Sequence, residues 1–125
     1  MEPNSNCRVF ITHDIGGKDF THAGRFGTLI PLVKGRLPYD MTGQEMLNDL
    51  NGMMRDYAEG DFLLLSGDPV IISIASMIAF SKVKRVNFLR WSRWDRGYEV
   101  IAVKDQDGMS KGMKRYTDRR GIMPV

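Results

Sequence analysis

The sequence predicts a small single-domain α/β sandwich with a mixed sheet of about five strands and three helices, followed by a basic C-terminal tail. Three observations support this fold class. Strand-like and helix-like segments alternate along residues 8–103 in the order β-α-β-α-β-α-β-β. The apolar run Phe62–Leu65 does not alternate, as is typical of a strand covered on both faces. The last two strands are consecutive, which favours a hairpin and therefore a mixed sheet.

The first part of the expected domain holds two strands and one short helix. Residues 8–13 alternate as a first strand does. Asp19 is the expected N-cap of a short helix, and Gly27 its left-handed stop. Residues 28–34 are rich in strand formers, but Pro31 has no amide hydrogen to donate to a ladder. We therefore expect an edge or irregular strand there.

The next helix carries the clearest signals. Thr42 and Glu45 form a capping box, and Met41 and Met46 occupy the positions of a hydrophobic staple. Apolar side chains at helical spacing predict one buried stripe, made of Met46, Leu47, Leu50, Met53, Met54 and Tyr57. Gly60 is the expected end of this helix.

The second part of the expected domain is a strand, a helix and a hairpin. The helix is apolar nearly all round, so we expect it to be central and buried. Asp95 and Arg96 are the expected hairpin turn. The predicted segments are the strand 62–66, the helix 69–81, and the strands 85–94 and 97–103. Residues 104–125 show no sustained apolar periodicity and form the predicted tail.

The turn SGDP, residues 66–69, stands where many α/β proteins hold a phosphate. Asp68 and Pro69 suit the N-cap and first helical positions for purely structural reasons. The Asp68 carboxylate would occupy the free backbone amides and repel an anion. The turn also lacks a G-x-G-x-x-G or G-K-[ST] pattern. We interpret it as a helix start rather than a nucleotide cradle.

The only cluster of histidines with carboxylates is His13, His22, Asp14 and Asp19. Its spacing matches no metal signature such as H-E-x-x-H. Loop capping and ordinary surface histidines are the preferred interpretation. We predict no catalytic residue, no metal and no cofactor.

Composition and charge limit the function class. At 125 residues the chain is one domain, and it has no apolar run near the roughly 20 residues of a membrane helix. The start, MEPNSNCR, predicts no secretory signal, and a single cysteine indicates a reducing, cytoplasmic location. Residues 1–81 hold 6 Lys and Arg against 10 Asp and Glu, whereas residues 82–125 hold 12 against 5. This split favours a basic surface that meets a polyanion, although a tail that only aids solubility is the alternative.

The segment KVKRVNFLRWSRWDRGYEV, residues 82–100, interleaves basic and aromatic side chains. Single-stranded nucleic acid favours this combination, because cations follow the phosphates and rings stack on the bases. The tail repeats this chemistry. The predicted nucleic-acid-binding residues are Lys82, Lys84, Arg85, Arg90, Arg93, Trp94, Arg96, Tyr98, Lys111, Lys114, Arg115, Tyr116, Arg119 and Arg120.

The two tryptophans are expected to differ. Strand alternation places Trp91 and Trp94 on opposite faces. We expect Trp94 to stack on a base and Trp91 to be a core residue. The alternative stays open that the rings of this segment are core and its arginines are only solvated or ion-paired.

The stretches DFTHAGRFG, LLLSGDPV and VNFLRW with RGY resemble a group of small, mostly uncharacterised proteins of tailed bacteriophages. The resemblance covers roughly residues 8–103 and implies a protein that works in the cytoplasm of an infected bacterium. The basic and aromatic end is also similar to the single-stranded-DNA-binding RNA polymerase cofactor of N4-related phages. Members of the group read W-D-R-x-x-R-x-Y where this chain reads WSRWDRGY, so no role for Trp91 or Trp94 is carried over.

Three functions remain as hypotheses. The first is a non-enzymatic accessory protein that binds single-stranded DNA or RNA, DNA preferentially, as a homo-oligomer and with an RNA polymerase as a possible partner. The second is a Rossmann-like module that captures a nucleotide or signalling molecule in a pocket at the strand ends. Its expected lining is His13, Asp14, Arg25, Gly67 and Asp68. The third is an inhibitor that acts on a host protein through its surface.

Overall fold

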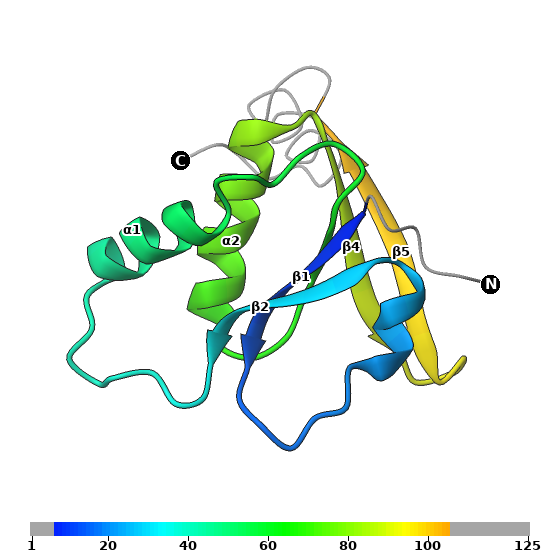
Figure 1. Ribbon diagram of the computed structural model, residues 1–125, viewed down its shortest axis with the longest axis horizontal. Coiled ribbons are helices and arrows are strands. Elements are labelled where there is room, and N and C mark those ends of the chain that lie inside the picture. The colour runs from blue at the N-terminus through cyan, green and yellow to red at the C-terminus, as the bar shows by residue number, and fades with distance from the viewer. Residues whose placement is uncertain (1–6, 106–125) are drawn as a thin grey trace, which may run out of the picture.

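The structure is a computed structural model that describes residues 7–105. It contains one five-stranded sheet with the strand order β2-β1-β3-β4-β5 (Figure 1). The strands are β1 (Arg8–Asp14), β2 (Thr28–Lys34), β3 (Phe62–Leu64), β4 (Arg85–Ser92) and β5 (Gly97–Lys104). The helices are α1 (Gly43–Met53), α2 (Pro69–Lys82) and the short 3-10 helix η1 (Thr21–Arg25).

The chain winds away from β1 in both directions. It passes through η1 to β2 at one edge, returns through α1 to β3 on the other side of β1, and continues through α2 to β4. Strands β1 to β4 are parallel, and β5 pairs antiparallel with β4. Figure 1 shows α1 and α2 on one face of the sheet and η1 on the other. The predicted α/β fold with a mixed sheet is confirmed. The direction in which successive strands are added to the sheet reverses between β1 and β3.

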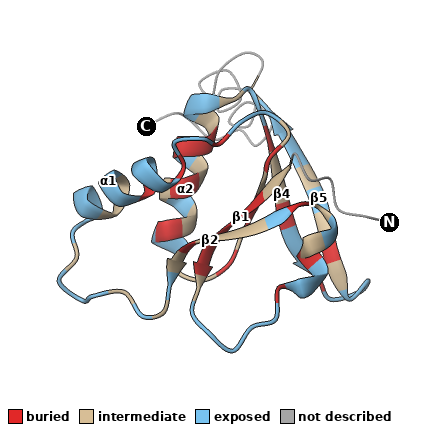
Figure 2. Ribbon diagram, in the orientation of Figure 1, coloured by how far each residue is buried: buried red, intermediate tan, exposed pale blue. Residues whose placement is uncertain are grey.

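The sheet separates two hydrophobic cores. On the face of α1 and α2, Phe10 and Leu63 of the sheet pack in one cluster with Leu50 and Ile71 of the helices. The residues next to them in the strands point the other way, as strand geometry requires. There the cluster around η1 contains Val9, Ile11, Leu64, Leu89, Tyr98, Phe20 and Ala23. Figure 2 shows burial concentrated on the inner strands and on the sides of the helices that face them.

Local signals of the sequence are confirmed where they act within a few residues. The Thr42 hydroxyl accepts the Glu45 amide at 3.1 Å, and the Glu45 carboxylate accepts from Thr42, so the capping box forms. Pro31 lies in β2 at the edge of the sheet, as a residue without an amide hydrogen should. Strand β3 is shorter than expected, because the Ser66 amide donates to the Thr12 side chain instead of to the ladder.

Helix α1 ends earlier than predicted. It stops at Met53 rather than at Gly60, since the chain turns there to bury Met54 and Tyr57. The Tyr57 amide donates to the Met54 carbonyl across this turn. The buried stripe is therefore confirmed at Leu50, Met54 and Tyr57 and wrong at Met53, whose side chain is exposed.

The hairpin turn also differs from the prediction. β4 ends at Ser92, and the turn is the four residues Arg93–Arg96 rather than Asp95 and Arg96 alone. Ser92 closes it, because its hydroxyl accepts the Asp95 amide at 3.3 Å and donates to the Asp95 carboxylate. Arg96 has a φ of 48°, which a longer turn accommodates at its last position. Trp94 consequently belongs to the turn and to neither face of the sheet.

Helix α2 is not central. It covers one face of the sheet and turns its far side to solvent, where Val70 and Met77 are 52% and 66% exposed. The short helix after Asp19 is a 3-10 helix capped at Phe20 without a side-chain bond, and Asp19 accepts the Thr21 amide instead. This hydrogen bond lowers the pKa of the Asp19 carboxyl.

Gly27 serves close packing rather than a left-handed stop. The φ angle of Gly27 is not positive. A Cβ at this position would lie 2.5 Å from the Cys7 carbonyl oxygen, so only glycine fits there. Strand β2 begins to pair with β1 directly after Gly27, and the Thr28 amide donates to that same oxygen at 3.1 Å.

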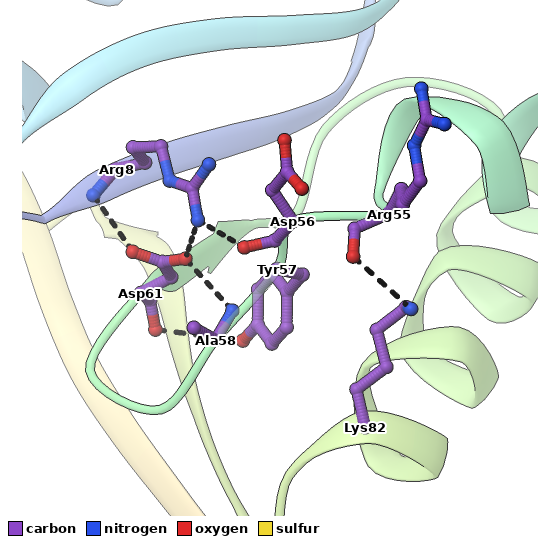
Figure 3. Close-up of polar contacts among 7 residues, drawn as sticks. All are labelled: Arg8, Arg55, Asp56, Tyr57, Ala58, Asp61 and Lys82. Atoms are coloured by element: carbon purple, nitrogen blue, oxygen red, sulfur yellow. Dashed lines mark hydrogen bonds and ion pairs between the residues drawn. The ribbon is translucent and has the colours of Figure 1, made fainter.

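Asp61 ties the start of β1 to the loop before β3 (Figure 3). The carboxylate is buried and accepts the Arg8 amide at 3.0 Å, the Arg8 guanidinium at 2.9 Å and the Ala58 amide at 2.9 Å. The same guanidinium donates to the Asp56 carbonyl. Tyr57 packs beside this group, and burial raises the pKa of its hydroxyl above the usual range. No sequence signal predicted this network.

The start of α2 yields a first prediction. The Asp68 carboxylate accepts the Val70 amide at 2.8 Å, which confirms the N-cap. Asp68→Ala is expected to lower the free energy of unfolding by about 1 kcal/mol, because one helix-terminal amide loses its acceptor. Asp68→Ser, which keeps a capping oxygen, is the matched control and should stay within a few tenths of a kcal/mol of the parent. Urea unfolding followed by circular dichroism measures both, and equal losses in the two variants would contradict the capping role.

Candidate functional site

The carboxyl ends of the parallel strands meet at one edge of the sheet. Four connections lie there: residues 15–20 after β1, residues 65–68 after β3, residues 35–42 after β2 and the turn 93–96 after β4. In doubly wound sheets a ligand binds at this edge, where the winding reverses. In this chain the reversal lies between β1 and β3, so the first two connections flank it.

A pocket of about 300 Å³ opens at this edge. We call it the switch-point pocket, and its lining includes Lys18, Asp19, Phe20, Leu64, Ser66, Trp91 and Tyr98. Most of the wall is apolar or aromatic, and the Lys18 ammonium lies 3.4 Å from the Ser66 hydroxyl. The Ser66 backbone is held by the Thr12 hydroxyl, which donates to its carbonyl at 2.5 Å. The Asp19 carboxylate lines the pocket as well, so its aromatic wall carries one charge of each sign, which suits a flat ring with polar substituents.

Trp91 forms the outer wall of the pocket. Its ring stands edge-on to Tyr98 with centroids 5.2 Å apart, and His22 of η1 lies 6.4 Å away. The side chain is 44% exposed, so the expectation that Trp91 is a core residue is wrong. The physical reason is that η1 is short and leaves the outer part of β4 and β5 uncovered on this face. Burial raises the pKa of Tyr98, and the Asp19 carboxylate adds to the shift, so Tyr98 stays a neutral hydroxyl.

The turn 93–96 projects beyond the pocket. Trp94 is 95% exposed, and it lies between Arg93 and Arg96, which are exposed too. An exposed indole of this kind contributes nothing to the core of the domain. The turn is also held in place, because the Ser92 hydroxyl donates to the Asp95 carboxylate and accepts from the Asp95 amide.

The other basic residues predicted for nucleic acid do not join this surface. The Arg90 guanidinium is paired with Glu99 at 2.8 Å and lies on the opposite face from Trp91. Lys82 ends α2 and donates to the Arg55 carbonyl at 3.4 Å (Figure 3). Lys84 and Arg85 are exposed at the start of β4, about 20 Å along the strand from Trp91 at the usual rise per residue. Tyr98 is buried behind Trp91.

The predicted tail contacts lie outside the described residues. These are Lys111, Lys114, Arg115, Tyr116, Arg119 and Arg120.

The alternative ligand residues are brought together only in part. His13, Gly67 and Asp68 line a second, more open pocket beside Ile15 and Arg36. Asp14 instead closes the loop after β1 by accepting the Gly16 amide at 3.0 Å. Arg25 lies on η1, where its guanidinium stacks over Phe26 at 4.7 Å from the ring centroid.

His13 has a structural role. Its Nδ1 accepts the Asp68 amide at 3.1 Å, so Nε2 carries the proton and donates to the Gly35 carbonyl at 2.7 Å. Both ring nitrogens are therefore used inside the fold. In residues 7–105 no three His, Cys, Asp or Glu side chains gather as a metal site would require.

The extent of the folded part agrees with a family match. Residues 8–105 match the family described as Phage Pam3 gp32-like protein. The chain belongs to this phage protein family. No curated protein and no solved structure matches it. The resemblance to phage proteins seen in the sequence is confirmed at this level, and within residues 7–105 this family member has no helix long and apolar enough to cross a membrane.

Sequence reasoning missed the residues that surround the switch-point pocket in this member of the family. Lys18 follows Gly16 and Gly17 in the loop after β1, and a cation after a glycine pair at a strand end is a usable signal. Ser66 belongs to the SGDP turn, of which only Gly67 and Asp68 are predicted as alternative ligand residues. Nothing in the sequence shows that Trp91 of β4 closes the same pocket, since this depends on where η1 ends.

Proposed function

We propose that this phage protein binds single-stranded nucleic acid, DNA preferentially, through Trp91, Trp94, Arg93 and Arg96 at the carboxyl edge of the sheet. The observation that carries the proposal is Trp94, almost fully exposed between two exposed arginines and three residues along the chain from the half-exposed Trp91. Stacking of a base on an aromatic ring is worth about 1–3 kcal/mol, and arginines supply the attraction for the phosphates.

The surface is suited to single strands rather than to a duplex. Its rings lie on a turn and on an open sheet face, where unpaired bases can reach both sides of an indole. Backbone contacts from Arg93 and Arg96 carry no sequence information, so binding is tolerant of base sequence. The similarity of the basic and aromatic end to the polymerase cofactor of N4-related phages supports a role as a transcription accessory in the host cytoplasm.

The decisive test removes the exposed ring. Trp94→Ala is expected to weaken binding of an oligo-dT probe by about 1–3 kcal/mol, as loss of one stacked base requires. Trp91→Ala should weaken it as well and cost less stability than a core tryptophan, because its ring is half-exposed. Tyr39→Ala is the matched control, since Tyr39 is an aromatic residue that is equally exposed in the loop after β2. Fluorescence anisotropy measures the affinities.

A salt titration separates the two contributions. The parent's logarithm of affinity should fall linearly with the logarithm of salt concentration, and Arg93→Ala with Arg96→Ala should make that slope shallower. Trp94→Ala should leave the slope unchanged. Unaltered oligo-dT binding in Trp94→Ala, or an effect of Tyr39→Ala of the same size, contradicts the proposal.

The switch-point pocket favours a second candidate function, the capture of a free nucleotide or a similar signalling molecule. The specific observation is the Lys18 ammonium beside Ser66 in an aromatic pocket at the reversal of winding. Calorimetry with mononucleotides tests it, with Lys18→Ala as the variant. Tight mononucleotide binding that Lys18→Ala removes and Trp94→Ala spares would favour this function over the first.

A further inference from the structure

The two edges of the sheet differ in how they are protected from other strands. Strand β2 carries Pro31 in its middle, and proline is one of the devices that stop an edge from pairing. Strand β5 has eight residues and neither a proline nor a bulge in its pairing with β4. Val100 and Val103 on this strand are 47% and 41% exposed. Within residues 7–105 nothing pairs with its outer side.

Hydrogen bonding to β4 shows which amides of β5 point outward. The Asp105 amide donates to the Lys84 carbonyl at 2.8 Å, so these two form a hydrogen-bonded pair of the antiparallel ladder. Hydrogen-bonded and non-hydrogen-bonded pairs alternate along the ladder. Glu99, Ile101 and Val103 therefore direct their N–H and C=O groups to β4. The residues between them direct their N–H and C=O groups to the open edge: Tyr98, Val100, Ala102 and Lys104.

We propose that two copies of this chain pair through their β5 edges, antiparallel and with Ile101 opposite Ile101, to form one continuous sheet. A two-fold axis perpendicular to the sheet keeps both faces in common, so Tyr98 lies opposite Lys104 and Val100 opposite Ala102. This register joins every outward residue of one strand to an outward residue of the other.

The strand is complementary to itself in this register. The three central pairs are apolar: Val100 with Ala102, Ile101 with Ile101, and Ala102 with Val100. Outside them Glu99 faces Val103 and Tyr98 faces Lys104, so no two like charges lie directly opposite each other. A partner of different sequence has no such match built into the strand, and this favours a second copy.

Pairing in this way would also place aromatic side chains of one copy in one row with basic side chains of the other. On the face of η1, Trp91 and Tyr98 of one copy would continue across the seam into Lys104 and Arg85 of the other. Trp91 would then lie about 14 Å from that Arg85, three strand spacings away. Each dimer would hold two such rows, with rings from one copy and cations from the other. This part rests on the proposed function; the pairing itself does not.

Cysteine cross-linking tests the register without nucleic acid. In a Cys7→Ser background, Ile101→Cys places two thiols at a non-hydrogen-bonded pair, where Cα atoms are about 4.5 Å apart and a disulfide fits. Val103→Cys is the control, because its equivalent in the second copy lies four residues along the strand. We expect oxidation to convert Ile101→Cys to a covalent dimer and to leave Val103→Cys monomeric on a denaturing gel. The reverse pattern, or equal cross-linking, overturns the register.

Light scattering tests the pairing itself. Ala102→Pro removes one outward amide and leaves the bonds to β4 intact, so the variant should keep its circular dichroism and change from dimer to monomer. Ala102→Thr keeps the amide and should remain dimeric. A parent chain that is monomeric at the concentrations of the cross-linking experiment overturns the proposal.

Mixing two defective variants tests the shared surface. One variant carries Trp91→Ala and Trp94→Ala, and the other Arg85→Ala and Lys104→Ala. If rings and cations come from different copies, exchange into mixed dimers rebuilds about a quarter of the parent's oligo-dT sites. If the variant with Arg85→Ala and Lys104→Ala binds like the parent, or if mixing restores no sites, the shared surface is wrong. Cross-linking at Ile101 with no oligo-dT binding by the parent would instead refute the proposed function and leave the pairing in place.

Discussion

Replacement of Asp61 by alanine is expected to lower the free energy of unfolding by about 3 kcal/mol. The buried carboxylate accepts two backbone amides and one guanidinium, from Arg8 and Ala58, and alanine offers none of these donors a partner (Figure 3). Most of the loss should come from the two amides. Leaving the Arg8 guanidinium unpaired costs less, since the Arg8 side chain is 30% exposed and water can replace the carboxylate.

Two further variants separate these contributions. Asp61→Asn keeps one acceptor oxygen in the same shape and should recover about half of the loss. Arg8→Ala removes the guanidinium with its bonds to Asp61 and to the Asp56 carbonyl, keeps the backbone amide, and should cost about 1 kcal/mol. Urea unfolding measures all three. A loss in Asp61→Ala no larger than in Arg8→Ala would show that the backbone amides are not what Asp61 stabilises.

Gly67→Ala is expected to cost about 3 kcal/mol or more, for two independent reasons. Gly67 has a φ of +87°, in the left-handed region that costs other residues about 1–2 kcal/mol. A Cβ at this position would also lie 2.3 Å from the Cβ of His13. The imidazole cannot move aside without losing its bonds to Gly35 and Asp68, so the overpacking adds about 1–3 kcal/mol.

Gly17→Ala is the matched control for this prediction. Its φ of +77° is similar, but a Cβ there meets nothing within 4 Å. It should therefore show the cost of the left-handed backbone alone, about 1–2 kcal/mol. Thermal unfolding compares the two variants. Equal losses would mean that the contact between Gly67 and His13 relaxes freely.

The candidate site was predictable in part, and the residues show why. Trp94, Arg93 and Arg96 are exposed as a binding role requires, because a turn rich in polar residues has nowhere to bury them. Arg90 looks equivalent in the sequence, yet the hairpin register sets it opposite Glu99 and pairs the two charges. His13 looks like a candidate ligand, yet the chain brings it to Gly35 and Asp68, which occupy both nitrogens.

The sequence by itself determined the α/β class, the capping box at Thr42, the N-cap at Asp68 and the edge position of the strand with Pro31. These features depend on hydrophobic periodicity and on hydrogen bonds between residues a few positions apart. The local sequence therefore sets them. Only the tertiary structure decided that Trp91 faces water and closes a pocket with Lys18 and Ser66. That outcome depends on how far η1 covers the sheet and on which loops meet at its carboxyl edge. Both are set by packing between residues far apart in the chain, so no local sequence pattern encodes them.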